Sequence, residues 1–235
     1  MGTRSADAPG GMLALVRLLQ LASPALPIGA YSYSQGLEWM IDSGAIRDSG
    51  TARRWVGDML DNVVADGEAA VLWRLLAAIQ CGDTQSFRNW NAWHRASRES
   101  RELRAETEQM GGSLVKLATD VDLMDEAGIE LASSIAPITL PAAFALACHA
   151  LDVQSETAVT GYVMSWLENQ VLVAVKALPL GQVAGQRMLL ELAGRIPAVV
   201  ARASTLDDDD VVSFAPGLAL ASARHEAQYS RLFRS

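Results

Sequence analysis

Hydrophobic residues recur every three or four positions along most of the chain, which is the spacing of one face of an α-helix. We find no segment of alternating hydrophobic and polar residues, the pattern of a half-buried strand. This predicts an all-α fold of roughly ten helices, with no internal repeat and no linker long enough to divide it. We expect a flexible segment at 1–11 and a single helical domain at 12–235. The clearest helical stretches are 12–21, 98–119, 141–151, 157–178, 181–194, 198–204 and 217–228.

Prolines, glycines and short polar residues predict where these helices begin and end. Pro24, Pro27 and Gly29 predict a loop after the first helix. Asp48 is placed to cap the next long helix, which the hydrophobic period extends to Gly82. The loop is therefore expected to separate a short first helix from the main helical body.

Two of the helical stretches carry more specific predictions. The stretch 157–178 is apolar on nearly all sides, which predicts a buried central helix. Within 98–119, Gly111 and Gly112 predict a kink or break, because a helical glycine costs about 1 kcal/mol relative to alanine. The charged residues around this stretch predict solvated ion pairs between residues four apart. These pairs are Arg95–Glu99, Arg98–Glu102 and Arg104–Glu108.

Composition excludes several classes of protein. The 235 residues are 50% hydrophobic and 20% charged, which is ordinary for a globular protein and unlike a disordered chain. No run of 18 apolar residues and no signal-peptide pattern is present, so we expect a cytoplasmic protein without a membrane-spanning segment. Two cysteines are too few for a disulfide framework. The net charge of −8 argues against nucleic-acid binding.

Charge is unevenly distributed, and the end of the sequence is basic. Residues 224–235 carry Arg224, Arg231 and Arg234 against Glu226, together with Tyr229 and Phe233. Arginine and aromatic residues are enriched at protein interfaces. The segment is therefore either a solvated terminus or a surface for binding a partner.

The sequence assembles no catalytic or metal site. The lysines do not lie in a GxxxxGK[ST] loop, so a nucleotide-binding P-loop is absent. The histidines are far apart in sequence, and Tyr229 stands where a HExxH motif needs its second histidine. Ser113 and Lys116 fit the short pattern SxxK, which leaves a helical serine hydrolase as an alternative, although the partner motifs of that class are missing. We expect no metal and no cofactor bound by this chain.

Two long segments resemble one family. Residues 18–38 have the sequence LLQLASPALPIGAYSYSQGLE, and residues 223–235 have the sequence ARHEAQYSRLFRS. Both closely resemble the UreF family of urease accessory proteins. The segments RESRELR at 98–104 and PLGQ at 179–182 are also similar to it, in the same order along the chain.

The resemblance implies a helical, non-catalytic maturation factor. Members of the family bind the accessory protein UreD, also called UreH, and recruit the GTPase UreG for nickel insertion into apo-urease. Nickel and GTP would then be handled by the complex. The resemblance also implies a homodimer, for which the sequence gives no independent support.

The matching motifs supply the candidate partner-binding residues. These are Tyr31, Ser34, Gly36, Glu38, Gln182, Arg224, His225, Glu226, Tyr229, Ser230, Arg231 and Phe233. Tyr31 and Arg231 are the leading candidates, because a rigid amphipathic ring and a planar five-donor cation suit an interface. We predict that deleting residues 225–235 abolishes partner recruitment and leaves the helical body folded; whether this segment is ordered without a partner stays open.

Overall fold

A computed structural model describes residues 9–235, and over this range the chain is helical without any strand. The predicted all-α class is confirmed. Twelve α-helices are joined by two 3-10 turns and one π-helical segment. The elements are α1 Pro9–Leu21, η1 Ala30–Ser32, α2 Leu37–Asp42, α3 Ser49–Met59, the π-helix η2 Leu60–Ala69, α4 Ala70–Gln80, α5 Thr84–Ala96, α6 Arg101–Asp120, α7 Glu126–Ser134, α8 Leu140–Ala150, α9 Ser155–Ala177, α10 Gln182–Ala193, α11 Ile196–Thr205, η3 Asp208–Asp210 and α12 Pro216–His225.

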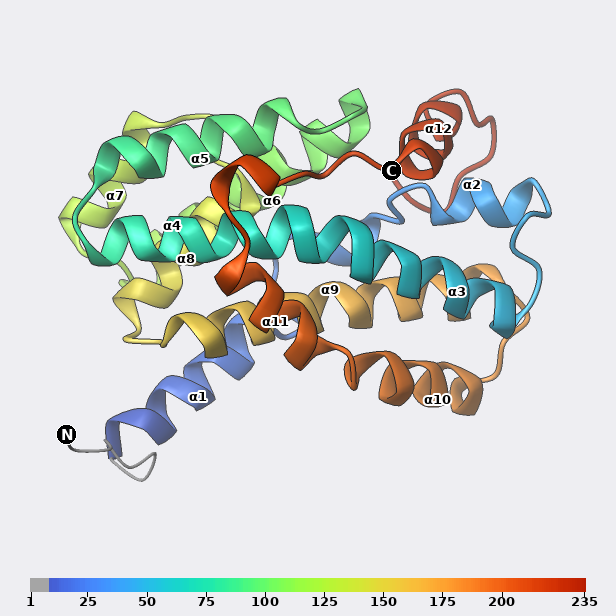
Figure 1. The fold of residues 1–235 in the computed structure, drawn as a ribbon, viewed down its shortest axis with the longest axis horizontal. Helices are drawn as coiled ribbons and strands as arrows, with labels where there is room; N and C mark the ends of the chain where they lie inside the picture. Colours follow the sequence, from blue (N-terminus) through green and yellow to red (C-terminus); the bar gives the residue numbers. More distant parts are fainter. Residues whose placement is uncertain (1–8) are drawn as a thin grey trace.

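The first helix begins earlier than the hydrophobic pattern predicts. Of the expected flexible segment 1–11, residues 1–8 lie outside the described residues, and α1 already starts at Pro9. Gly10 and Gly11 are helical, because a proline at the start supplies a helical φ without needing an amide donor. The helix projects from the body at the lower left of Figure 1.

One long rod crosses the molecule and is formed by α3, η2 and α4 in direct continuation (Figure 1). Asp48 caps its start as predicted, since its carboxylate accepts from the Thr51 amide at 2.8 Å in a capping box. Because α3, η2 and α4 form one continuous helical rod, the number of separate helices in the described residues is close to the predicted ten. The π-helical segment in its middle has no counterpart in the sequence prediction.

The buried central helix predicted at 157–178 is α9. It packs against α1, α2, α3, α4, α8, α10 and α11. Val159, Val163 and Leu167 on it are fully buried. The main hydrophobic core is continuous from α1 through α11. Within residues 9–235, no helix is long and apolar enough to cross a bilayer.

The predicted break at Gly111 and Gly112 is wrong, because α6 runs unbroken from Arg101 to Asp120. A Cβ on Gly111 would lie 2.6 Å from the carbonyl carbon of Thr139, just before α8. Gly111 therefore serves close packing between α6 and the segment leading into α8, while Gly112 faces open space.

The predicted ion pairs between residues four apart are not those that form. Helix α5 ends at Ala96 and α6 begins only after Ser100, so pairs that span this break are not on one helix. Arg95 pairs instead with Glu108, Arg98 with the buried Glu68, and Glu102 with Arg231. The face of α6 that we expected to be solvated is therefore partly internal.

Candidate functional site

The loop between α1 and α2 presents Tyr31 at the surface. Gly29 has a φ of 84°, a left-handed conformation that L-residues with a side chain rarely adopt. The 3-10 turn η1 follows, and Tyr31 on it is 56% exposed. Tyr33 faces inward, where its hydroxyl donates to Gln109 at 2.7 Å. The proline- and glycine-containing loop therefore holds one tyrosine outside and anchors the other.

Gly36 lets the last helix approach the start of α2. Its φ is 77°, and a Cβ there would lie 2.9 Å from the Cβ of Ala221 on α12. Such a distance is well inside normal van der Waals contact, so only glycine fits without movement. The first and last family motifs are therefore in direct contact, beside one another at the upper right of Figure 1.

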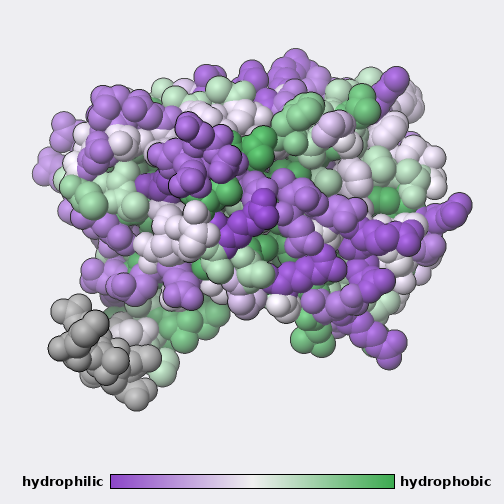
Figure 2. Space-filling model, in the orientation of Figure 1, coloured by the Kyte–Doolittle hydropathy of each residue, from purple (hydrophilic) through white to green (hydrophobic). Residues whose placement is uncertain are grey.

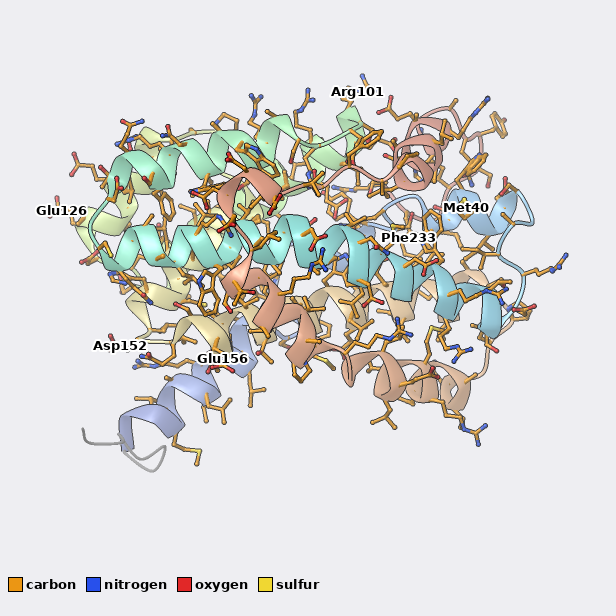
Figure 3. The ribbon with its side chains drawn as sticks, viewed as in Figure 1. Met40, Arg101, Glu126, Asp152, Glu156 and Phe233 are labelled. Atoms are coloured by element: carbon orange, nitrogen blue, oxygen red, sulfur yellow. The ribbon has the colours of Figure 1, made fainter. Side chains whose placement is uncertain are left out.

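Glu38 on α2 binds the C-terminal segment, by which we mean residues 226–235. Its carboxylate accepts from the backbone N–H of Leu232 at 2.6 Å and of Phe233 at 3.0 Å. The Glu38 side chain is 6% exposed, and Phe233 is also buried, lying beside α2 in Figure 3. A carboxylate that accepts backbone N–H groups forms strong, charge-assisted hydrogen bonds.

His225 at the end of α12 lies between two carboxylates. Its Nε2 is 3.1 Å from Glu38 Oε2, and its Nδ1 is 2.7 Å from Glu102 Oε2 on α6. The His225 side chain has no exposed area. Arg231 of the C-terminal segment donates to the other oxygen of Glu102 at 2.6 Å. These four side chains join the first motif, α6 and the end of the chain.

Further hydrogen bonds hold the rest of the C-terminal segment. The Arg234 amide donates to the Ser32 carbonyl at 2.7 Å, and the Ser34 amide donates to the Ser235 carbonyl at 2.8 Å. The Glu226 carboxylate accepts from the Arg101 amide at 2.9 Å, at the N-terminus of α6. Figure 3 shows Arg101 at the edge of the molecule, where α6 begins. The segment is thus tied down along its length.

A second buried carboxylate, Glu106, lies under the end of this segment. It accepts from the Gln35 side chain and from the Ser235 hydroxyl, each at 2.8 Å. Burial raises the pKa of the Glu106 carboxyl from 4.5 to about 7, and the two hydrogen bonds oppose this rise only in part. Glu106 is therefore partly protonated at neutral pH.

Tyr31 and Gln182 lie on one groove between η1, α9 and α10. The groove has a cavity volume of about 100 Å³, and its walls include Leu172, Val175 and Leu189. Gln182 itself is exposed. The Ser32 carbonyl, next to Tyr31 in sequence, accepts from the Arg234 amide of the C-terminal segment.

The structure corrects our prediction of direct partner contact for five residues. Ser34, Gly36, Glu38, His225 and Phe233 are buried among residues of the chain itself, so a partner cannot touch them in this conformation. The remaining candidates have at least part of their surface exposed. These are Tyr31, Gln182, Arg224, Glu226, Tyr229, Ser230 and Arg231.

The C-terminal segment is packed on α2 and α6. Phe233 is 7% exposed, whereas Tyr229 and Leu232 remain in solvent. Deleting residues 225–235 would leave Glu38 and Glu102 without their imidazole partner and Glu38 buried without its amide donors. Such a deletion would therefore lower the stability of the folded chain as well as remove exposed surface for a partner.

Two residues of this region were missed as site residues by sequence reasoning. Glu102 and Glu106 are one helical turn apart on α6; we expected Glu102 on a solvated face and made no prediction for Glu106. Glu106 follows Leu103 by three positions and therefore lies on the apolar stripe of that helix. A carboxylate within an apolar stripe was the available signal.

The alternative of a serine hydrolase has no structural support. Lys116 is 76% exposed and donates to Asp120 at 2.7 Å, so its ammonium group is engaged with a carboxylate rather than with Ser113. Within the described part of the chain, no three His, Cys, Asp or Glu side chains lie close enough to hold a metal ion. Of the three histidines, His94 and His225 are buried and His149 is exposed.

Exposed apolar residues gather over α1 and beside α12 on the face drawn in Figure 2, which is otherwise largely hydrophilic. Phe214, Leu220, Tyr229 and Leu232 are each at least 65% exposed. Patches of this kind mark surfaces that bind other proteins. The fold and the site together define a helical binding protein.

Comparison with known proteins identifies the family. The UreF family model matches residues 46–193. The urease accessory protein UreF of Azoarcus sp. (strain BH72) is 50% identical over 233 residues, covering 98% of this chain and 100% of the relative. That of Janthinobacterium sp. (strain Marseille) is 50% identical over 222 residues, covering 94% and 98%. The chain belongs to the UreF family; it is a urease accessory protein, a maturation factor and not an enzyme.

Proposed function

We propose that this chain is a scaffold that binds the accessory protein UreD (UreH) and recruits the GTPase UreG for nickel insertion into apo-urease. It acts in the cytoplasm, where Cys81 and Cys148 stay reduced; both are free cysteines in the structure. The partners are those that the family resemblance implies. The chain contributes binding surfaces rather than chemistry.

One observation carries the proposal: the two family motifs, nearly 200 positions apart in sequence, form one surface. The hydrogen bond from Leu232 to Glu38 spans 194 positions. Of the residues in these two motifs, Tyr31, Tyr229 and Leu232 are exposed. Burying a large apolar side chain contributes about 1.5–3 kcal/mol, so three such residues supply the core of a specific interface.

Nickel and GTP are assigned to the partners. The chain has no P-loop sequence, so the nucleotide that drives the process belongs to UreG. Nickel is cargo in this account, and the described residues offer it no cluster of three ligands.

The test is binding of purified chain to UreD (UreH), followed by addition of UreG with and without GTP and nickel. Leu232→Ala and Tyr229→Ala should each weaken the first complex roughly tenfold or more, because each removes an exposed apolar anchor. Leu190→Ala is the matched control, since Leu190 on α10 is 76% exposed and Leu232 is 72% exposed. Equal affinity of all three variants and wild type would contradict this assignment of the surface.

We also propose a homodimer, on the strength of the resemblance alone. Sedimentation at micromolar concentration should show a species of twice the chain mass of 25.1 kDa. A single species of the monomer mass across the concentration range would contradict it.

A further inference from the structure

Glu38 holds the C-terminal segment by its backbone. Its two oxygens accept the amide protons of consecutive residues, Leu232 at 2.6 Å and Phe233 at 3.0 Å. Both residues lie in a bend of the chain. Leu232 is 72% exposed, while Phe233 is 7% exposed. One buried carboxylate therefore fixes which side chain of this pair faces solvent and which faces the core.

The imidazole of His225 links Glu38 to Glu102. An ionised carboxylate only accepts hydrogen bonds, so each ring nitrogen donates to one glutamate when the ring carries both protons. Arg231 donates to the far oxygen of Glu102, at 2.6 Å. Glu38, His225, Glu102 and Arg231 thus form one continuous chain of hydrogen bonds.

The other bonds of the segment do not fix this orientation. Arg234 and Ser235 are bound through the Ser32 and Ser34 backbone, beyond the Leu232–Phe233 pair. The backbone N–H groups of residues 226–228 donate to carbonyls of their own helical turn. Arg231 binds Glu102 through its side chain, immediately before the pair. Glu38 is therefore the group that binds the backbone N–H groups in the middle of the segment.

We propose that Glu38 is a positioning residue for partner binding, which acts through the C-terminal segment without touching the partner. By binding the amides of Leu232 and Phe233 it presents the Leu232 side chain, and with it Tyr229, to UreD (UreH). This inference rests on the proposed function for the identity of the partner. The ordering of the segment by Glu38 does not depend on the identity of the partner.

The first experiment is hydrogen exchange of the full chain, comparing wild type with Glu38→Gln. The substitution keeps the shape and replaces one accepting oxygen by a donating NH₂ group, which faces an amide or a ring nitrogen. Exchange of the Leu232 and Phe233 amides should become at least tenfold faster, while amides of α9 keep their rates. Unchanged protection of these two amides would overturn the proposal.

Glu68→Gln is the burial-matched control. Glu68 is 7% exposed and is bound to Arg98 at 2.9 Å and to the Tyr162 hydroxyl at 2.8 Å, with no contact to the segment. Its substitution should leave the exchange of residues 226–235 unchanged. If it releases the segment as Glu38→Gln does, the effect is general loosening and the proposal is wrong.

The second experiment is a double-mutant cycle on affinity for UreD (UreH). Glu38→Gln should weaken binding at least tenfold, and adding Leu232→Ala to it should weaken binding by much less than Leu232→Ala does alone, because the side chain is already misplaced. Additive losses, or full affinity with a released segment, would overturn the positioning role. If Glu38→Gln does not fold by circular dichroism, Glu38→Asp replaces it in both experiments, because it keeps the charge and shortens the reach.

The two proposals fail separately. If wild-type chain does not bind UreD (UreH), the proposed function fails, and the exchange experiment still decides whether Glu38 orders the segment. If wild type binds and Glu38→Gln binds equally well, only the positioning role is refuted.

Discussion

Replacing Gly36 by alanine tests the contact between the two ends of the chain. Gly36 has a φ of 77°, and an added Cβ would lie 2.9 Å from the Ala221 Cβ and 3.1 Å from the Ser222 nitrogen of α12. Gly44 is the matched control, because its φ is 75° and a Cβ there meets nothing within 4 Å. Both variants suffer the same backbone strain, and only Gly36→Ala pushes against α12.

The magnitude follows from two contributions. A left-handed conformation costs an L-residue roughly 1–2 kcal/mol, and this applies to both variants. Carbon atoms at optimal contact are about 3.5–4.0 Å apart, so Gly36→Ala forces a shift of roughly 0.6–1.1 Å. Overpacking of this kind costs about 1–3 kcal/mol. Gly36→Ala should therefore lower the free energy of unfolding by about 1–3 kcal/mol more than Gly44→Ala.

The assay is urea denaturation of wild type and both variants, followed by far-ultraviolet circular dichroism. In thermal unfolding the same difference corresponds to a Tm gap of roughly 2–12 °C for a chain of this size. Gly36→Ala should also speed hydrogen exchange in α12. Equal losses of stability for the two variants would refute the view that Gly36 is needed for the close approach of α12.

Three further substitutions have defined outcomes. Gly112→Ala should raise the free energy of unfolding by up to about 1 kcal/mol, whereas Gly111→Ala should lower it, because only Gly111 lies against Thr139. Urea denaturation measures both changes. A change of the same sign in both variants would contradict the packing role of Gly111. Burial raises the pKa of Glu106 to about 7, so the folded chain keeps a proton that the unfolded chain releases and stability falls as pH rises from 4.5 to 7. Glu106→Gln removes this pH dependence, so its free energy of unfolding should rise relative to that of wild type by up to about 3 kcal/mol between pH 4.5 and pH 8. A difference in stability between the two proteins that does not change with pH would count against the raised pKa of Glu106. Asp48→Ala should cost about 1 kcal/mol through loss of the Thr51 cap, and unchanged thermal stability would contradict this.

Local patterns in the sequence predicted most of the helices. The hydrophobic period and the capping residues depend only on neighbouring positions in the sequence. They therefore correctly predicted the start of a helix at Asp48 and the buried, central position of α9. They also indicated α8 and α10 to within a residue at each end. The missed helix α7 is short, and η2 is continuous with its neighbours, so neither leaves a strong local signal.

The errors concern contacts between residues far apart in sequence. The local sequence around Gly111 and Gly112 does not distinguish a break in the helix from close packing against another segment. The close approach of Thr139 to Gly111 shows that the packing role is the correct one. Likewise, the basic end of the chain suggested a solvated terminus. Arg231 in fact pairs with Glu102, 129 positions earlier, and His225 binds Glu38, 187 positions earlier.

The candidate site was predictable in part. The motifs that supplied the candidate residues are in contact, and Tyr31 and Tyr229 are exposed. Burial of His225 agrees with the general preference of histidines outside a metal site for the core, whereas burial of Glu38 could not be foreseen, because charged side chains are rarely buried unless they are paired. The second partner of His225, Glu102, comes from α6, which carries no part of either terminal motif.

The most direct test of the central claim is the nickel content of urease made with and without this chain. Urease subunits and the other accessory proteins would be produced together in one host, with wild type, Leu232→Ala, Leu190→Ala or no UreF-family chain. The account predicts nickel-loaded, active urease with wild type and Leu190→Ala, a clear loss with Leu232→Ala, and nickel-poor enzyme without the chain. Full nickel loading in the absence of the chain would contradict its role in urease maturation.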